Sequence, residues 1–173
     1  IKKNDNDRSG ASEMTFDLSI ILLIKNGGRR LELLMESLKR QKFSGSFEII
    51  AIDSGSEDGS LEILEKYNTR IFRIKPEEFH HSRTRNLGAQ KSKGEVLVYL
   101  TQDALPINND LLEKLVKPLK DPEVAVSYGR QIANPDAADV NKFFYSYFYP
   151  DEKKVLSKEV ANNPKKFYIN YIY

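Results

Sequence analysis

The sequence predicts an α/β fold with a mostly parallel central sheet and helices on both faces. Short apolar runs alternate with helical patterns from residue 18 to about residue 128, and this alternation is typical of βαβ units. The first run, residues 18–24, is almost continuously apolar and rich in β-branched side chains. Such a run is typical of a strand that is covered on both faces of a parallel sheet. The 173 residues are enough for one domain with a buried core.

Five strands are expected along this part of the chain. They cover residues 18–24, 47–52, 69–74, 95–100 and 124–128. Beyond residue 128 the alternation of strand and helix patterns fades. An aromatic run then covers residues 143–149, and a tail rich in Lys, Asn and Tyr follows it.

Four helices are expected between these strands. The first carries apolar residues at helical spacing, namely Leu31, Leu34, Met35 and Leu38. The second is expected to open at residues 54–57, whose Ser-Gly-Ser-Glu sequence matches a capping box. The third covers residues 82–91 and is closed by Gly94. The fourth follows Asn109, a residue type that caps helix N-termini.

Composition excludes several classes of protein. The formal net charge of +2 and the pI near 8.6 do not indicate the clustered basic stripe of a nucleic-acid surface, so we expect no nucleic-acid partner. The absence of cysteine excludes disulfides, zinc-thiolate sites and thiol nucleophiles, and it fits a reducing compartment. The longest apolar stretch is far shorter than the roughly 20 residues that span a bilayer. We therefore expect a cytoplasmic protein.

Polar clusters follow three of the predicted strands. They are Lys25 with Asn26 after the first strand, Asp53 after the second, and Asp103 after the fourth. Ligands of an open parallel sheet bind at the carboxyl ends of its strands, where loops and helix N-termini converge. We therefore expect the three clusters to face one crevice.

Each of the two carboxylates has two interpretations. Asp53 can accept the imide N–H of uracil or thymine, or it can help to cap the helix that follows. Asp103 can hold a hard divalent cation, Mg²⁺ or Mn²⁺, through its oxygens, or it can be a turn residue before Pro106. The two roles of Asp53 are compatible with each other.

Basic and aromatic residues supply further candidates. Arg83 and Arg85 can contact phosphate oxygens, although a solvated helix face is the favoured interpretation for Arg83. With only His80 and His81 in the chain, a histidine metal cluster or a Ser-His-Asp relay has little support. The aromatic run at 143–149 is expected in the core or in a strand pair. A sugar-stacking platform, a membrane-facing edge and a partner surface are the alternatives for it.

Several strings together resemble family 2 glycosyltransferases. The most specific of them is Ile-Asp-Ser-Gly-Ser-Glu-Asp-Gly-Ser at residues 52–60, which follows the apolar run and Lys25-Asn26. Three further strings and a dipeptide look like the rhamnosyltransferase-like branch of bacteria: His-Ser-Arg-Thr-Arg-Asn-Leu-Gly at 81–88, Leu-Thr-Gln-Asp-Ala at 100–104, Tyr-Gly-Arg-Gln at 128–131, and Tyr149-Pro150. The resemblance covers about residues 18–150.

The resemblance implies a Rossmann-like GT-A nucleotide-diphospho-sugar transferase fold. It implies an inverting transfer of a sugar, with rhamnose as one candidate, from a UDP- or dTDP-sugar donor to a glycan or lipid-linked acceptor. Bacterial surface polysaccharide synthesis is the expected setting, at the inner face of the cell membrane with peripheral association. The expected domains are a disordered lead-in at 1–15, the nucleotide-sugar-binding domain at 16–150, and an incomplete acceptor-side segment or tail at 151–173.

By the same resemblance, the site residues receive roles. Lys25 and Asn26 flank the base, Asp53 holds its imide, and Arg85 approaches the donor. Asp103 is the metal-binding position, and Gln102 joins the nucleotide-sugar-binding set. Many relatives carry two acidic residues around the metal, whereas this chain has Thr-Gln-Asp at residues 101–103. The family's general base is expected further along, so no catalytic base is assigned within this chain.

Two other functions remain as alternatives. One is a truncated, non-catalytic nucleotide-binding module whose aromatic tail docks a partner or completes a homodimer. The other is a nucleotidyltransferase, which shares a Rossmann-like donor site. Neither a dinucleotide-binding glycine fingerprint nor a Walker-type loop is present in the sequence, so dinucleotide enzymes and ATPases have little support.

Overall fold

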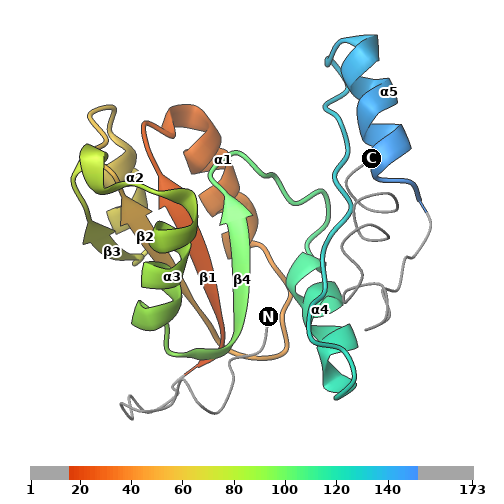
Figure 1. The fold of residues 1–173 in the computed structure, drawn as a ribbon, viewed down its shortest axis with the longest axis horizontal. Coiled ribbons are helices and arrows are strands. Elements are labelled where there is room, and N and C mark those ends of the chain that lie inside the picture. Colours follow the sequence, from red (N-terminus) through yellow and green to blue (C-terminus); the bar gives the residue numbers. More distant parts are fainter. Residues whose placement is uncertain (1–15, 152–173) are drawn as a thin grey trace. The chain divides into compact units, whose positions relative to one another are not determined.

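Four parallel strands form the centre of the fold, in the order β3-β2-β1-β4 (Figure 1). The strands are β1 (Phe16–Ile24), β2 (Phe47–Asp53), β3 (Arg70–Arg73) and β4 (Gly94–Thr101). Strand β1 lies between β2 and β4 and pairs with both in parallel. The predicted α/β fold with a parallel sheet is confirmed.

The computed structural model describes residues 16–151. The chain divides into two compact units, Ile1–Ser127 and Tyr128–Tyr173, and each is considered by itself. The lead-in expected at residues 1–15 and almost all of the segment expected at 151–173 lie outside the described residues. The expected domain bounds stay a prediction.

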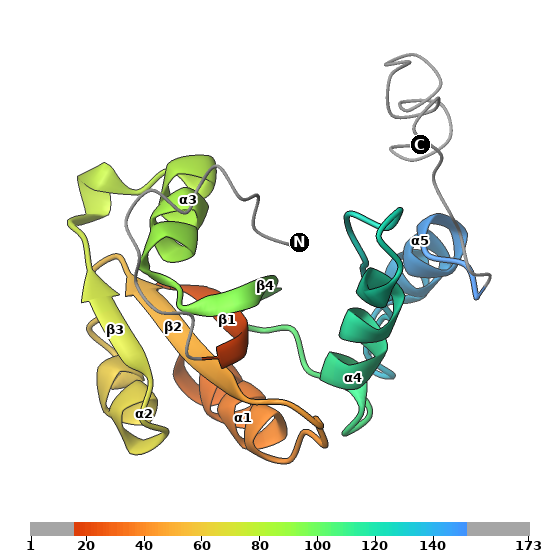
Figure 2. The same ribbon diagram turned by 90° about the horizontal axis from the view of Figure 1, so that it is seen from below.

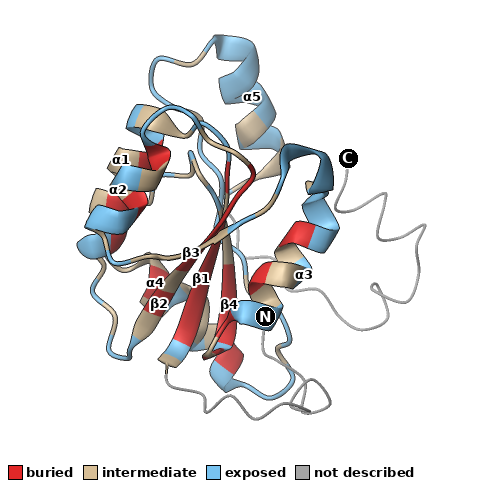
Figure 3. Ribbon diagram, turned by 90° about the vertical axis from the view of Figure 1, so that its left-hand side faces the viewer, coloured by how far each residue is buried: buried red, intermediate tan, exposed pale blue. Residues whose placement is uncertain are grey.

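Helices cover both faces of the sheet, as expected (Figures 2 and 3). Helices α1 (Gly28–Lys39) and α2 (Ser60–Lys66) lie on one face, and α3 (His81–Lys91) lies on the other. Helix α3 approaches β1 closely because Gly88 has no side chain. A Cβ at that position would come within 2.5 Å of the Ile21 Cγ2 atom.

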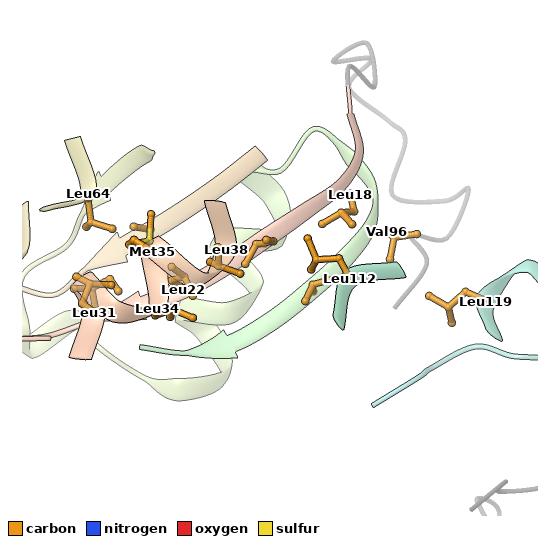
Figure 4. Close-up of a cluster of buried hydrophobic side chains, with 14 residues drawn as sticks. Leu18, Leu22, Leu31, Leu34, Met35, Leu38, Leu64, Val96, Leu112 and Leu119 are labelled. Atoms are coloured by element: carbon orange, nitrogen blue, oxygen red, sulfur yellow. The ribbon is translucent and has the colours of Figure 1, made fainter. Parts of the chain in front are cut away.

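The main hydrophobic core lies between the sheet and the α1–α2 face. Leu31, Leu34, Met35 and Leu38 of α1 are fully buried there, which matches their helical spacing in the sequence. Figure 4 shows these side chains beside Leu64 of α2 and Leu18 and Leu22 of β1. The cluster extends to Leu112 of the short helix α4 (Leu111–Val116).

Three short helices complete the described structure. The 3-10 helices are η2 (Pro76–Glu78), before α3, and η3 (Lys117–Lys120), after α4. Helix α5 (Asp139–Phe148) belongs to the second unit. No helix within residues 16–151 is long and apolar enough to cross a membrane.

Five local expectations were wrong. Helix α3 ends at Lys91 with Ser92 as its C-cap, and Gly94 begins β4 rather than closing the helix. Residues 124–128 form no strand. Helix α2 begins at Ser60, after the left-handed Gly59, rather than at the capping-box pattern of 54–57. The residue before α4 is Asp110, not Asn109, and its side chain makes no cap hydrogen bond. The aromatic run lies on helix α5, where Phe143 and Tyr147 are exposed, rather than in the core or a strand pair.

A buried carboxylate joins the strands at the amino edge of the sheet. Glu48 of β2 is 6% exposed and accepts hydrogen bonds from Ser19 Oγ of β1 (2.7 Å) and from the Lys93 N–H before β4. Arg70 of β3 forms an ion pair with it. Burial raises the pKa of Glu48, but the hydrogen bonds from Ser19, Lys93 and Arg70 outweigh it and hold the pKa below its ordinary value. The ionised carboxylate of Glu48 thus contacts β1, β3 and the residue before β4.

Replacing Glu48 by Gln should destabilise the fold. The amide would turn N–H groups toward donors, and hydrogen bonds to a charged group contribute about 2 kcal/mol each. Because the folded-state pKa is lowered, the stabilisation is present above the unfolded pKa and is lost as the pH falls through the folded-state value. Urea unfolding at pH 7 and at about pH 3 should show a difference between wild type and variant that shrinks in acid. The exposed Glu65→Gln is the control, and equal stability of the two variants would contradict this role.

Candidate functional site

Strand register places the three predicted polar clusters at one edge of the sheet. Ile24 of β1 pairs with Asp53 of β2, and Leu23 pairs with Thr101 of β4. The loops that contain Lys25 and Asp103 therefore leave the sheet at the same edge as the end of β2. Neighbouring strands lie about 4.8 Å apart, so the ends of β2 and β4 are roughly 10 Å apart across β1. This span is comparable to the length of a nucleoside diphosphate.

The loop after β1 is joined to the loop after β2 by hydrogen bonds. The Asn26 N–H donates to Ser56 Oγ (2.9 Å), and Asn26 Oδ1 accepts the Glu57 N–H (2.9 Å). Asn26 has a φ of 48°, a left-handed conformation that Asn tolerates better than most residues. The Ser54 N–H and hydroxyl both donate to the Ile24 carbonyl (3.0 and 3.1 Å). The two loops therefore form one surface.

Ser60 also holds the loop after β1, at the start of α1. Its buried hydroxyl accepts the Gly27 N–H at 2.9 Å and donates to Asp58 Oδ1 at 2.5 Å. The hydrogen bond from the Ser60 hydroxyl is the main cause that lowers the pKa of Asp58. One serine thus links the start of α1 to the start of α2.

Asp53 is enclosed by its own loop. Its side chain is 1% exposed, and its carboxylate accepts the N–H groups of Gly55 (3.0 Å) and Ser56 (3.2 Å). The Lys25 ammonium group lies over the same turn and donates to the carbonyls of Ser54 and Gly55. Asp53 therefore closes a turn between β2 and α2.

A cavity of about 200 Å³ lies beside these loops on the α3 face. Its lining includes the ends of β1 and β4 and the start of α3, with these polar or aromatic side chains: Lys25, Phe79, His81, Arg85, Thr101 and Gln102. Arg85 Nη1 donates to the His81 carbonyl at 3.2 Å. Burial raises the pKa of the neighbouring Tyr99, and the Arg85 charge opposes that shift. Three of the predicted site residues therefore meet in one cavity.

Asp103 lies in the loop after β4 and differs from Asp53 in its exposure. Its side chain is 52% exposed, and its nearest cation is Arg30 of α1, with Nη1 at 4.0 Å from Oδ2. Arg83, for which a solvated helix face is the favoured interpretation, is exposed. Asp103 is thus an accessible carboxylate near a basic side chain.

A family model described as glycosyl transferase family 2 matches residues 19–169. The chain belongs to glycosyltransferase family 2. It is 33% identical over 135 residues to the O-antigen chain rhamnosyltransferase RfbN of Salmonella typhimurium, and 34% identical over 117 residues to WbaN of Salmonella anatum, which carries the same description. The alignments cover 75% and 67% of this chain but 43% and 37% of those proteins. The described glycosyltransferase domain is thus shorter than either relative.

Solved glycosyltransferases share the fold of this family 2 domain. S. aureus TarS, solved with UDP, is 25% identical with a TM-score of 0.52, and the match covers 62% of this chain and 32% of that one. The Pyrobaculum calidifontis mannosyltransferase PcManGT, solved with GDP-Man and Mn²⁺, is 22% identical with a TM-score of 0.56. That match covers 67% of this chain and 36% of that one. The predicted GT-A fold is confirmed.

Asp103 is the candidate metal ligand of this glycosyltransferase domain. No group of three or more His, Cys, Asp or Glu side chains within residues 16–151 is placed to hold a metal ion. On the β4 side of this edge, Asp103 supplies an exposed carboxylate. Mg²⁺ commonly binds through one or two carboxylates together with substrate phosphates and water. The donor set therefore fits a cation that arrives with a diphosphate.

Serine hydroxyl groups that were not predicted as site residues organise this glycosyltransferase site. Ser56 and Ser60 hydrogen-bond to the loop after β1, whereas the sequence pattern predicts only a helix start and a family motif there. A signal was available, because three serines alternate with Gly, Glu and Asp over residues 54–60. Such residues bond local backbone groups outside helices. His81 and Phe79 of the cavity carried no such signal.

Replacing Ser60 by Ala should loosen the loop after β1. The change removes the acceptor of the Gly27 N–H, and an unsatisfied buried donor costs about 1–3 kcal/mol. Urea unfolding should show that loss, and hydrogen exchange of the Gly27 amide should become faster. Ser82→Ala, which removes an exposed hydroxyl on α3, should leave both values unchanged. Unaltered Gly27 exchange in Ser60→Ala would contradict the anchoring role.

Proposed function

We propose that this chain forms the donor-binding part of an inverting glycosyltransferase. The donor is a UDP- or dTDP-sugar, and the acceptor is a glycan or a lipid-linked glycan. The observation that carries the proposal is the placement of the Lys25, Asp53 and Asp103 loops at one sheet edge of a family 2 domain. The descriptions of RfbN and WbaN support rhamnose as the sugar and surface polysaccharide synthesis as the setting.

The base of the nucleotide is assigned to the β2 side of the edge. Asp53 would accept the imide N–H of uracil or thymine, with Lys25 and Asn26 beside the ring. Oδ1 of Asp53 receives one hydrogen bond of 3.2 Å, from a Ser56 N–H that also bonds Oδ2, so it keeps acceptor capacity. Because Asp53 is 1% exposed, the loop that covers it has to shift when the base binds.

The diphosphate is assigned to the β4 side. Arg85 lines the cavity there, and guanidinium groups bind phosphate oxygens in a bidentate manner. Asp103 would hold Mg²⁺ or Mn²⁺, which supplies positive charge to a departing diphosphate when bound. In the inverting reaction an acceptor hydroxyl displaces the nucleoside diphosphate from the anomeric carbon. No described residue is assigned as the base that removes the hydroxyl proton.

A second candidate function rests on helix α5. Its residues Val140, Phe143, Phe144 and Tyr147 recur at helical spacing and are at least half exposed, which is unusual for large apolar side chains on one stripe. A non-catalytic nucleotide-binding module would use this stripe to dock a partner or a second copy. Release of nucleoside diphosphate in the presence of acceptor would exclude this non-catalytic module.

The cytoplasmic location and peripheral membrane association stay part of the first proposal, the glycosyltransferase.

Asp53→Asn should weaken nucleotide binding. Calorimetry with UDP and with dTDP should give at least one measurable affinity for wild type, and the variant should lose about tenfold or more, because a hydrogen bond to a charged group is worth about 1.5–3 kcal/mol. The matched control is Asp17→Asn at the opposite edge, where Asp17 accepts the Ser46 N–H and hydroxyl. If wild type binds neither nucleotide at millimolar concentration, or if Asp53→Asn binds as wild type does, the proposal fails.

Asp103→Asn should remove the effect of Mn²⁺ on nucleotide affinity. In wild type we expect Mn²⁺ to tighten binding of the nucleoside diphosphate by about tenfold, a typical coupling between two ligands. The variant should bind the nucleotide equally with and without Mn²⁺. Asp110→Asn, at a residue of similar exposure, should retain the metal effect. An undiminished metal effect in Asp103→Asn would show that another group holds the cation.

A further inference from the structure

Gln102 makes a closed pair of hydrogen bonds with the backbone of Lys25. Its Oε1 accepts the Lys25 N–H at 2.9 Å, and its Nε2 donates to the Lys25 carbonyl at 3.0 Å. The two residues are 77 positions apart, and they follow the neighbouring strands β1 and β4. The pair continues the β1–β4 hydrogen bonding beyond the last paired residues, Leu23 and Thr101.

Only a side chain with both a donor and an acceptor can make this pair. A carboxylate at position 102 would still accept the Lys25 N–H, but it would present a lone pair to the Lys25 carbonyl. An apolar side chain of the same length would leave both backbone groups without this partner. The second position of the Thr-Gln-Asp sequence is therefore matched to the Lys25 backbone rather than to a cation or a phosphate.

The Gln102 pair holds the β4 side of the loop after β1, and serine hydroxyl groups hold its β2 side. On the β2 side, Asn26 and Gly27 are bonded to Ser56 and Ser60. On the β4 side, within residues 16–151, the Gln102 side chain hydrogen-bonds to the backbone of Lys25. Lys25 and Gln102 both line the 200 Å³ cavity, so a change in the loop changes the cavity wall.

We propose that Gln102 is a positioning residue that fixes the Lys25–Asn26 backbone for nucleotide binding, and that it is not itself a ligand of the donor or the metal. This inference rests on the proposed function, because it assigns the loop after β1 to the nucleotide. It replaces the expectation that Gln102 belongs to the nucleotide-sugar-binding set. It also leaves Asp103 as the one acidic side chain of residues 101–103.

Two variants of the full 173-residue chain separate positioning from charge. Gln102→Glu keeps the size and the acceptor but loses the donor, and Gln102→Met keeps the length and loses both without adding charge. Hydrogen exchange of the Lys25 amide, measured without nucleotide, reports whether the pair is broken. Calorimetry with UDP and with dTDP reports whether nucleotide affinity depends on it.

We expect Gln102→Met to speed exchange of the Lys25 amide and to weaken nucleotide binding about tenfold, the scale of one or two net hydrogen bonds. Gln102→Glu should also weaken binding, while the Lys25 amide keeps part of its protection. Donor KM should rise more than kcat falls, because the loop positions the nucleotide rather than the reacting atoms.

Gln41→Glu is the matched control. Gln41 also bridges two backbone groups, since its Nε2 donates to the Asn108 carbonyl (2.9 Å) and its Oε1 accepts the Leu112 N–H (3.2 Å). It follows helix α1, away from the strands' carboxyl ends. The control variant should change stability at most and leave nucleotide affinity unchanged.

Three results would overturn the inference, and they differ from failure of the proposed function. If Gln102→Met exchanges the Lys25 amide faster yet binds nucleotide as wild type does, the pair does not position the site. If only Gln102→Glu weakens binding, charge rather than position is responsible. If Gln102→Met leaves Lys25 exchange unchanged, the pair does not hold the backbone. Wild type that binds neither nucleotide would instead refute the proposed function itself.

Discussion

The parallel pairing of β1 with β2 and β4 determines where each loop of the site leaves the sheet. Its register places Asp53 beside Ile24 and Thr101 beside Leu23, so three loops leave the sheet at one edge. Ionised Glu48 links the same strands at the opposite edge. The sheet is therefore fixed at both ends, and the spacing of the polar loops follows from the strand spacing.

The loops at the carboxyl edge are ordered mainly by side chains that bond to backbone groups. Ser54, Ser56 and Ser60 each contact the end of β1 or the loop after it, and Gln102 contacts it from the other side. Such bonds fix a loop without using the charged groups that a ligand needs. Arg85 and Asp103 remain available to phosphate and cation, whereas Asp53 and Lys25 are engaged with the loop until a ligand displaces part of it.

Some of this arrangement could be predicted from the sequence. The strands at 18–24 and 95–100 and the α1 core residues were predicted because apolar periodicity reports burial directly. The position of Asp53 and Asp103 at one edge followed from the parallel sheet. The start of α2 was not predictable in this way, because Ser-Gly-Ser-Glu fits a capping box equally well. The contacts of Gln102 and Glu48 join residues far apart in the chain, and no local pattern reveals such partners.

In the proposed complex, one nucleoside diphosphate spans the edge from the β2 loop to the β4 loop. A crystal structure of the chain with UDP or dTDP and Mn²⁺ would locate the bound nucleotide. We expect the base next to Asp53 and the diphosphate between Arg85 and Asp103, with the Gln102–Lys25 pair intact. Nucleotide bound at any other surface, with this edge unchanged, would contradict it.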